Sequence, residues 1–358
     1  MVIAVNACTL QTKGRSSIQN FIYEVLLKMA TMHPEHQFLV VFDNTNKESV
    51  AFPNNVLLIK STSTPQNSLS FKYWCSIKLP AILKKYSPNI ILQLTGYCCS
   101  TLKTPQILFL QDWTYNNFFS TKFLTKASKI VTYSHISKNL LVEKFEKVTD
   151  KLEVIYAAGD SKFKCLDFYK TSQVKDGFAD GREYFIYLAN DDIDDNIMTV
   201  LKAFSLFKKW QRSNMKLLVA RQVTQQSIIS KMETYKYKDD VVFLGDIDTD
   251  KLSKITASAY LALYLSSFDD AGISIINAMQ CGVPVIAANV GCLPEIGDNA
   301  AFYYNQNSSD ELSEKLQLIY KDEKLRSNLI KDGLLQAAKF NTDITAKSMW
   351  ELIEKTAN

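Results

Sequence analysis

Short apolar runs alternate with helix-length segments along the chain, and this alternation limits the possible folds more than any other feature. In the first half the apolar runs read VIAVNA, QFLVVFD, NVLLI, NIILQL, QILFLQD, KIVTYS and LEVIYA, and residues 17–32 between the first two are amphipathic. Strands that are apolar at nearly every position are typical of parallel sheets covered by helices on both faces. We therefore expect a doubly wound α/β domain.

The same alternation starts again at residue 184. The expected strands there are YFIYLA, MKLLVA, DVVFLG, AYLALYL, VPVIAA and AAFYY, and the expected helices are 197–210, 227–235, 250–257 and 272–281. Three further helical stretches lie between residues 309 and 355. Two Rossmann-like domains in tandem would leave a cleft at the carboxyl ends of their strands.

The domain boundaries follow from where the apolar pattern lapses. Residues 157–183 are rich in Lys, Asp and Gly, so we place the interdomain linker there. A chain of 358 residues fits two domains. We predict a first domain at residues 1–165, a second at 166–340, and a C-terminal helix at 341–358 that could cross back to the first domain.

Composition excludes several classes of protein. Hydrophobic residues make up 47% and charged residues 22%, the balance of a folded chain. The net charge is +4 and Lys and Glu look interleaved, so we expect no nucleic-acid partner. Seven cysteines without a CxxC pair argue against a disulfide framework or a zinc site and favour a reducing cytosol.

The remaining compositional expectations concern membranes and histidines. The opening MVIAVNA reads as a first strand and not as a signal peptide, and no run approaches the ~18 apolar residues of a membrane span. Any membrane contact would be peripheral. We expect His33, His36 and His135 to be structural, without a catalytic triad or metal site, and Cys98 and Cys99 to pack in a loop.

Residues 268–296, FDDAGISIINAMQCGVPVIAANVGCLPEI, resemble the donor-site region of glycosyltransferase family 4, whose members are retaining enzymes of the GT-B fold. The most specific part is NAMQCGVPVIAANVGCLPEI. The segments VIAVNACTL, KIVTYSHISKNLL, LEVIYAAGDSKF, YFIYLANDDIDDNIMTVLKAFSLF and VVFLGDIDTDKL also resemble the family. The resemblance implies two Rossmann-like doubly wound domains that face each other across a cleft.

The resemblance also implies site residues in the second domain. Asp269 and Asn277 occupy the positions of the family's Glu-x7-Glu pair, of which the first faces the donor sugar and the second binds the ribose hydroxyls. Gly272 and Ile273 fall in the same donor site, and Glu295 of the Pro-Glu pair would lie near the nucleotide base. The alternatives are that Asp269 is a helix N-terminal acid, that Asn277 is a helix surface residue and that Glu295 caps a helix.

The phosphate-binding charge of the family is altered. Residues 190–196 read NDDIDDN where the family has an Arg and a Lys. One charge pair at about 5 Å and an effective dielectric of about 20 is worth roughly 3 kcal/mol, so this change weakens diphosphate binding. Arg221 could approach a phosphate instead, or be an ordinary surface arginine. A divalent metal in the acidic loop is the less favoured reading, and we predict no metal.

Two first-domain segments also differ from the family. Residues 13–17, KGRSS, replace a Gly-rich loop, and Gly14 and Arg15 are candidate donor-binding residues. Gln111 and Asp112 replace a His-Asp pair near the sugar and are candidate catalytic residues. A basic exposed loop and ordinary loop structure are the alternatives.

Together these features predict an enzyme that transfers a sugar from a nucleotide-diphosphate sugar, with no other cofactor, to a glycan or lipid-linked saccharide. We expect a cytoplasmic protein with peripheral contact to the inner membrane face and a partner glycosyltransferase. The alternative is a catalytically degenerate GT-B protein that binds glycans or stabilises a partner. A nucleotide-sugar epimerase is disfavoured by the NAMQCGVPVIAANVG match.

Overall fold

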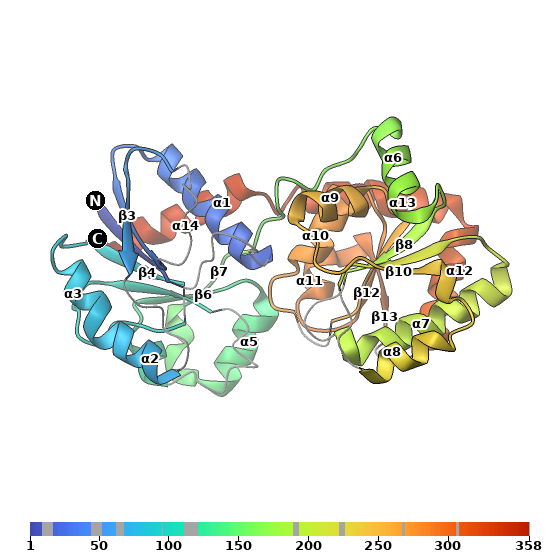
Figure 1. Ribbon diagram of the computed structural model, residues 1–358. Helices are drawn as coiled ribbons and strands as arrows, with labels where there is room; N and C mark the ends of the chain where they lie inside the picture. The colour runs from blue at the N-terminus through green and yellow to red at the C-terminus, as the bar shows by residue number, and fades with distance from the viewer. Residues whose placement is uncertain are drawn as a thin grey trace. The chain divides into compact units, whose positions relative to one another are not determined.

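The computed structural model describes residues 1–8, 17–43, 52–61, 68–94, 96–110, 121–188, 193–221, 226–266, 269–305 and 308–357. The chain divides into two compact units. In Figure 1 the first unit is coloured from blue to green and the second from green to red, and the red last helix belongs to the first unit. Unit 1 contains Met1–Ala158 and Asn341–Asn358, and unit 2 contains Gly159–Phe340. Each unit is built on one parallel sheet.

The sheet of unit 1 has seven strands in the order β3-β2-β1-β4-β5-β6-β7. Its strands are β1 (Val2–Ala7), β2 (Gln37–Asp43), β3 (Val56–Ser61), β4 (Ile90–Gln93), β5 (Gln106–Phe109), β6 (Lys129–Thr132) and β7 (Leu152–Val154). The strand order reverses direction at the β1/β4 boundary, which gives a doubly wound sheet. Its central strands are apolar and buried on both faces, as the sequence pattern predicts.

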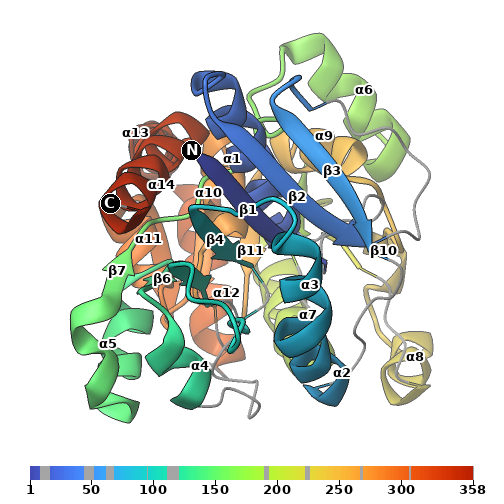
Figure 2. The same cartoon turned by 90° about the vertical axis from the view of Figure 1, so that its left-hand side faces the viewer.

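Helices cover both faces of this sheet, as Figure 2 shows from the side of unit 1. They are α1 (Ser17–Met32), α2 (Ser68–Tyr73), the π-helical turn η1 (Trp74–Lys78), α3 (Leu79–Leu83), α4 (Thr121–Lys126), α5 (His135–Lys144), the 3-10 turn η2 (Glu146–Lys151) and α14 (Thr342–Ala357). The last helix, α14, packs against the first, α1. Lys28 and Asp343 form an ion pair of 2.5 Å between them.

A buried polar chain crosses the core of unit 1. The Asn6 amide donates to Oε1 of Gln93 at 2.8 Å, and the Gln93 amide donates to Oε1 of Gln106 at 2.9 Å. Gln106 in turn accepts from the backbone N–H of Cys99 at 2.7 Å and donates to its carbonyl at 2.8 Å. Because buried amides are costly without partners, these bonds fix strands β1, β4 and β5 in one register. Cys98 and Cys99 are both buried thiols, as the loop-packing prediction expects.

The sheet of unit 2 has six strands in the order β10-β9-β8-β11-β12-β13. They are β8 (Tyr184–Tyr187), β9 (Lys216–Val219), β10 (Val241–Phe243), β11 (Leu261–Tyr264), β12 (Val285–Ala288) and β13 (Ala301–Tyr304). The order reverses at the β8/β11 boundary. In open α/β sheets this topological switch point is where ligands bind, outside the carboxyl ends of the strands.

The helices of unit 2 also cover both faces of its sheet. They are α6 (Phe168–Ala179), α7 (Ile193–Gln211), α8 (Gln226–Glu233), α9 (Thr249–Ala257), α10 (Ile273–Gln280), α11 (Leu293–Gly297), α12 (Ser309–Lys321) and α13 (Glu323–Ala337), with 3-10 turns η3 (Lys238–Asp240) and η4 (Asp298–Ala300). Helix α12 packs on α7, and α13 packs on α10. Among the residues of known placement, no helix is long and apolar enough to span a bilayer.

Helix α6 lies within residues 157–183, where the sequence analysis places the interdomain linker and lists no helix. The Asp167 carboxylate caps this helix by accepting from the backbone N–H of Lys170 at 2.8 Å, and Asp180 ends it in the left-handed conformation. Only Ala179 of this helix is buried. A helix that buries so little lacks the one-sided apolar periodicity by which sequence analysis finds helices.

Candidate functional site

The candidate site of unit 2 is the loop that joins β11 to α10 at the switch point. This loop carries Asp269, and the loop after β12 lies against it. The backbone N–H of Cys292 donates to the Asp269 carbonyl at 3.0 Å. Both loops follow neighbouring parallel strands, so their contact places the candidate residues at the carboxyl edge of the sheet.

The carboxylate of Asp269 is held by four donors. Its Oδ1 accepts the backbone N–H groups of Ala271 at 2.8 Å and Gly272 at 2.7 Å, and the Cys292 thiol lies 3.7 Å away. Its Oδ2 accepts the hydroxyl of Tyr264 at 2.6 Å. A carboxylate oxygen has two lone pairs, so the three donors around Oδ1 occupy its acceptor positions, whereas Oδ2 accepts the Tyr264 hydroxyl. This arrangement agrees with the helix N-terminal alternative and orients the carboxylate firmly.

Tyr264 and Cys292 are kept protonated by their surroundings. Burial, followed by the charge of Asp269, raises the pKa of Tyr264 well above its usual range. The same two causes, in the same order, raise the pKa of Cys292. Both groups therefore act as neutral hydrogen-bond donors to a carboxylate at neutral pH.

Gly291 permits the close approach of the two loops. Its φ is +52°, and a Cβ at this position would lie 2.5 Å from the Asp269 carbonyl oxygen. Any larger residue would therefore push the loop after β12 away from Asp269. Glycine is needed here for both space and backbone conformation.

Asn277 lies on α10 and is 3% exposed, so the alternative that it is a helix surface residue is wrong. Its side-chain Oδ1 accepts the backbone N–H of Asp160 at 2.8 Å. This bond ties α10 to the segment just before α6, 117 residues earlier in the chain. The side-chain oxygen of Asn277, the residue expected to bind the ribose hydroxyls, therefore already accepts one hydrogen bond.

The other predicted residues of unit 2 have different placements. Gly272 is the N-cap of α10 with φ of +65°, and the side chain of Ile273 is buried, so only its backbone can face a ligand. Glu295 lies in the first turn of α11, where the helix dipole favours a negative charge. Arg221 is half-buried just after β9, at the same edge of the sheet.

Several predicted residues lie outside the described part of the chain. They are Lys13, Gly14, Arg15, Gln111, Asp112 and residues 190–192 of the acidic loop. The side chains of Asp194 and Asp195 also lie outside it. Their proposed roles remain predictions.

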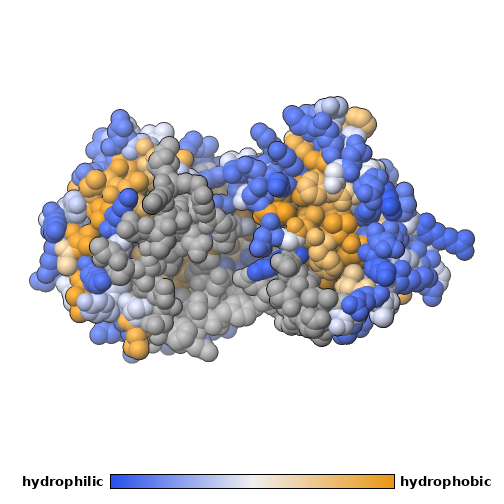
Figure 3. All heavy atoms as spheres, viewed as in Figure 1, coloured by the Kyte–Doolittle hydropathy of each residue, from blue (hydrophilic) through white to orange (hydrophobic). Residues whose placement is uncertain are grey.

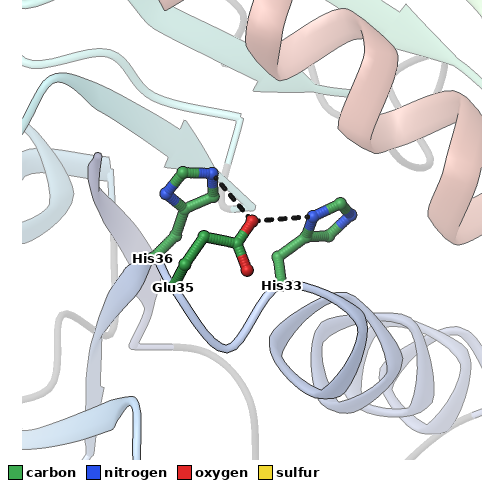
Figure 4. Close-up of side chains that lie close together, drawn as sticks. All are labelled: His33, Glu35 and His36. Atoms are coloured by element: carbon green, nitrogen blue, oxygen red, sulfur yellow. Dashed lines mark ion pairs between the residues drawn. The ribbon is translucent and has the colours of Figure 1, made fainter.

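The histidines differ from expectation at one place, because His33 and His36 converge on Glu35 (Figure 4). Nδ1 of His33 and Nε2 of His36 lie 3.5 and 3.3 Å from one Glu35 oxygen. Their ligand atoms all lie within 4.8 Å of one another, so this cluster could contact one metal ion. His33 also stacks on Trp350 of α14, with ring centroids 3.6 Å apart. The cluster precedes β2 and so lies at the amino edge of its sheet, opposite the edge where ligands bind.

Sequence analysis missed Tyr264, Gly291, Cys292 and Asp270 as site residues. Asp270, the second acid of the Asp-Asp pair, is 4% exposed and so lies in the interior beside Asp269. Two adjacent acids before a Gly at a strand end were the available signal for it. The Gly-Cys pair in NVGCLPEI was the signal for the second loop.

Comparison with known proteins assigns the family of unit 2. Residues 169–335 match the family model for glycosyl transferases group 1. Most of unit 2 is thus similar to a group 1 glycosyl transferase domain. This match includes both loops of the candidate site and supports the resemblance found in the sequence.

Relatives and solved structures agree with this assignment. The chain is 25% identical over 226 residues to the O-antigen chain mannosyltransferase B of Escherichia coli, covering 61% of this chain and 58% of that protein. A sucrose-phosphate synthase from Thermosynechococcus elongatus has a TM-score of 0.80 at 16% identity, covering 99% and 98% of the two chains. Anabaena HepE in complex with UDP and glucose has a TM-score of 0.74 at 14% identity, covering 99% and 100%. These likenesses show the GT-B fold, and the match spans little more than half the length of the curated mannosyltransferase.

Proposed function

We propose that this protein is a retaining glycosyltransferase that moves a sugar from a nucleotide-diphosphate sugar to a glycan or lipid-linked saccharide. The observation that carries the proposal is the rigid Asp269 carboxylate at the switch point of a group 1 glycosyl transferase domain. A preorganised carboxylate can stabilise positive charge that develops on a reacting sugar, and the helix N-terminus beside it can stabilise the negative charge of the leaving diphosphate.

The relatives suggest which donors to test first. The Escherichia coli relative is named as an O-antigen chain mannosyltransferase, and the Anabaena structure contains UDP and glucose. We propose that GDP-mannose and UDP-glucose are the leading donor candidates and that the acceptor is a growing glycan. A cytoplasmic location with peripheral contact to the inner membrane face, and a partner glycosyltransferase, belong to the same proposal.

The test is calorimetric titration of the full chain with UDP-, GDP- and dTDP-sugars, followed by assay of sugar transfer or donor hydrolysis. We expect one donor class to bind and to turn over. Asp269→Asn should preserve the fold, because an amide oxygen can still accept the two backbone N–H groups. Its turnover should fall about tenfold or more, equivalent to about 1.4 kcal/mol. Asp310→Asn, at an exposed acid on α12, is the matched control and should leave turnover unchanged.

A second candidate function rests on the donors that hold the Asp269 carboxylate and on the Asn277 bond to Asp160. These contacts would suit a degenerate GT-B protein in which both side chains only hold the fold. Donor binding without turnover, with no effect of Asp269→Asn on binding, would support it. The absence of binding to every donor at millimolar concentration would refute the enzyme proposal.

A further inference from the structure

The continuous helical segment α2-η1-α3 of unit 1 has two apolar faces. One face packs into the core through Trp74, Cys75, Leu79 and Leu83, all of which are buried. A surface helix of a globular protein normally has one such face, with polar residues opposite. The opposite face of this segment needs a different explanation.

This second face consists of Leu69, Tyr73 and Ile77, spaced four residues apart. Their exposed fractions are 74%, 51% and 55%. Four-residue spacing places side chains on one stripe of a helix, so the three form a row on successive turns. In Figure 3, hydrophobic side chains reach the surface at the lower left, where Figure 1 places α2.

Lysines accompany this row. Lys72 is exposed and lies three residues after Leu69, and Nζ of Lys78 lies 5.8 Å from the centre of the Tyr73 ring. Residues 49–111 contain six lysines and neither Asp nor Glu. The charges of the chain are therefore not evenly interleaved, contrary to our sequence-based expectation. A basic segment with an exposed apolar row has the composition of an interfacial membrane helix.

The backbone of this segment is pinned so that the exposed row is presented firmly. Pro80 cannot donate to the carbonyl of Ser76, four residues earlier, and the Thr101 hydroxyl donates to that carbonyl instead at 3.1 Å. The π-helical turn η1 precedes it, where the backbone N–H of Leu79 bonds to the Trp74 carbonyl. The apolar row is thus built into a fixed part of the unit.

We infer that the Leu69-Tyr73-Ile77 row is a docking surface for an anionic lipid bilayer. The apolar side chains would enter the interface between headgroups and acyl chains, and the lysines would contact anionic headgroups. A bilayer fits better than a second protein chain because basic residues are present without acids over the whole segment. This inference deepens the proposed function, since it would hold the enzyme next to a lipid-linked acceptor.

The experiment is sedimentation of the full chain with vesicles of phosphatidylcholine alone and of phosphatidylcholine with about one-third phosphatidylglycerol. We expect binding to the anionic vesicles that weakens with salt. The combined variant Leu69→Ser, Tyr73→Ser and Ile77→Ser should lower the vesicle affinity more than tenfold. Lys72→Glu should lower it at least about fivefold, since each lysine near an anionic surface contributes a factor of about five.

Matched controls separate this surface from apolar exposure in general. Leu335→Ser and Trp210→Ser change side chains of unit 2 that are 62% and 66% exposed, and both should leave vesicle binding unchanged. Circular dichroism and thermal unfolding show whether the triple variant is folded, and Lys72→Glu tests the surface independently if it is not.

Three outcomes would overturn the inference. The first is a wild-type chain that binds neither vesicle. The second is a folded triple variant that binds anionic vesicles as tightly as wild type. The third is a wild-type chain that self-associates without binding vesicles and a triple variant that no longer self-associates. This result would show that the row binds a second copy of the chain. Donor binding by the same variants tests the proposed function separately, because the row lies in unit 1 and a folded variant should still bind donor through unit 2.

Discussion

The Tyr264 hydroxyl donates a 2.6 Å hydrogen bond to Oδ2 of Asp269, between the end of β11 and the start of α10. The tyrosine is buried, and it spans the turn that brings the acid to the carboxyl edge of the sheet. Because of this bond, the position of the Asp269 carboxylate depends on the packing of the core as well as on the conformation of the loop.

Tyr264→Phe should lower the free energy of unfolding by about 1.5–3 kcal/mol, because the bond has a charged acceptor. Tyr184→Phe is the matched control, since its buried hydroxyl donates at 2.6 Å to the neutral carbonyl of Ile255. We expect the control to cost only about 0.5–1.5 kcal/mol. Urea denaturation of both variants measures the difference, and equal losses would show that the charge of Asp269 does not strengthen the bond.

Gly291→Ala should destabilise unit 2 far more than a second glycine substitution. Gly291 has φ of +52° and a prospective Cβ contact of 2.5 Å, whereas Gly245 has φ of +65° and nothing within 4 Å. Gly245→Ala should cost about 1–2 kcal/mol from backbone conformation alone. Gly291→Ala should cost at least about 2 kcal/mol more, because the loop must move. Thermal unfolding distinguishes them, and similar values would mean that the two loops separate easily.

Asn277→Ala should leave the buried N–H of Asp160 without its acceptor and cost about 1–3 kcal/mol. Asn277→Asp keeps an acceptor at the same place and should cost less. If Asn277 also binds ribose, donor affinity should fall in the alanine variant even at temperatures well below unfolding. Calorimetry with UDP and GDP checks this, and unchanged affinity would limit Asn277 to a structural role.

His36 should make the protein less stable in mild acid. Burial, followed by the nearby N-terminal amine 3.0 Å from its Nδ1, lowers the pKa of His36. The unfolded chain therefore takes up this proton at a higher pH than the folded chain does, near pH 6.5. The contribution of neutral His36 to the free energy of unfolding is fully present above about pH 6.5. It is lost as the pH falls toward the pKa of His36 in the folded chain.

The measurement is urea unfolding of wild type and His36→Gln between about pH 8 and pH 5. Between about pH 6.5 and pH 5 the free energy of unfolding should fall less steeply in the variant than in wild type. Above this range the free energies of unfolding of the two proteins should differ by a constant amount. A parallel slope in the variant would assign the pH dependence to other groups. Repeating the series with a chelator tests whether a metal at the His33-Glu35-His36 cluster contributes.

Much of the fold follows from the sequence because its strands are apolar on both faces and its helices carry one apolar stripe. The predicted helix at residues 17–32 matches α1, and every predicted strand overlaps an observed one. Helix α6 was missed because it buries almost nothing, and α2-η1-α3 was missed because it is apolar on two sides and contains Pro80. Periodicity finds helices with one apolar face, and neither segment has that pattern.

The candidate residues could be named from the sequence, but their contacts could not. Asn277 lies in the middle of α10, and Asp269 lies in the loop that precedes this helix. It could not show that Tyr264 and Asp160 occupy their oxygens, since these contacts join residues from other strands and loops. Such pairings depend on the folded backbone and not on any local spacing.

The packing of α14 on α1 also determines the order in which the chain can mature during synthesis. Ribosomes make the N-terminal end first, so all of unit 2 leaves the exit tunnel before α14 does. Until then α1 has no partner for this face, and His33 has no Trp350 to stack on. The first unit to be started is therefore the last to be finished, and nascent chains halted before residue 342 should keep this face of α1 open to chaperones.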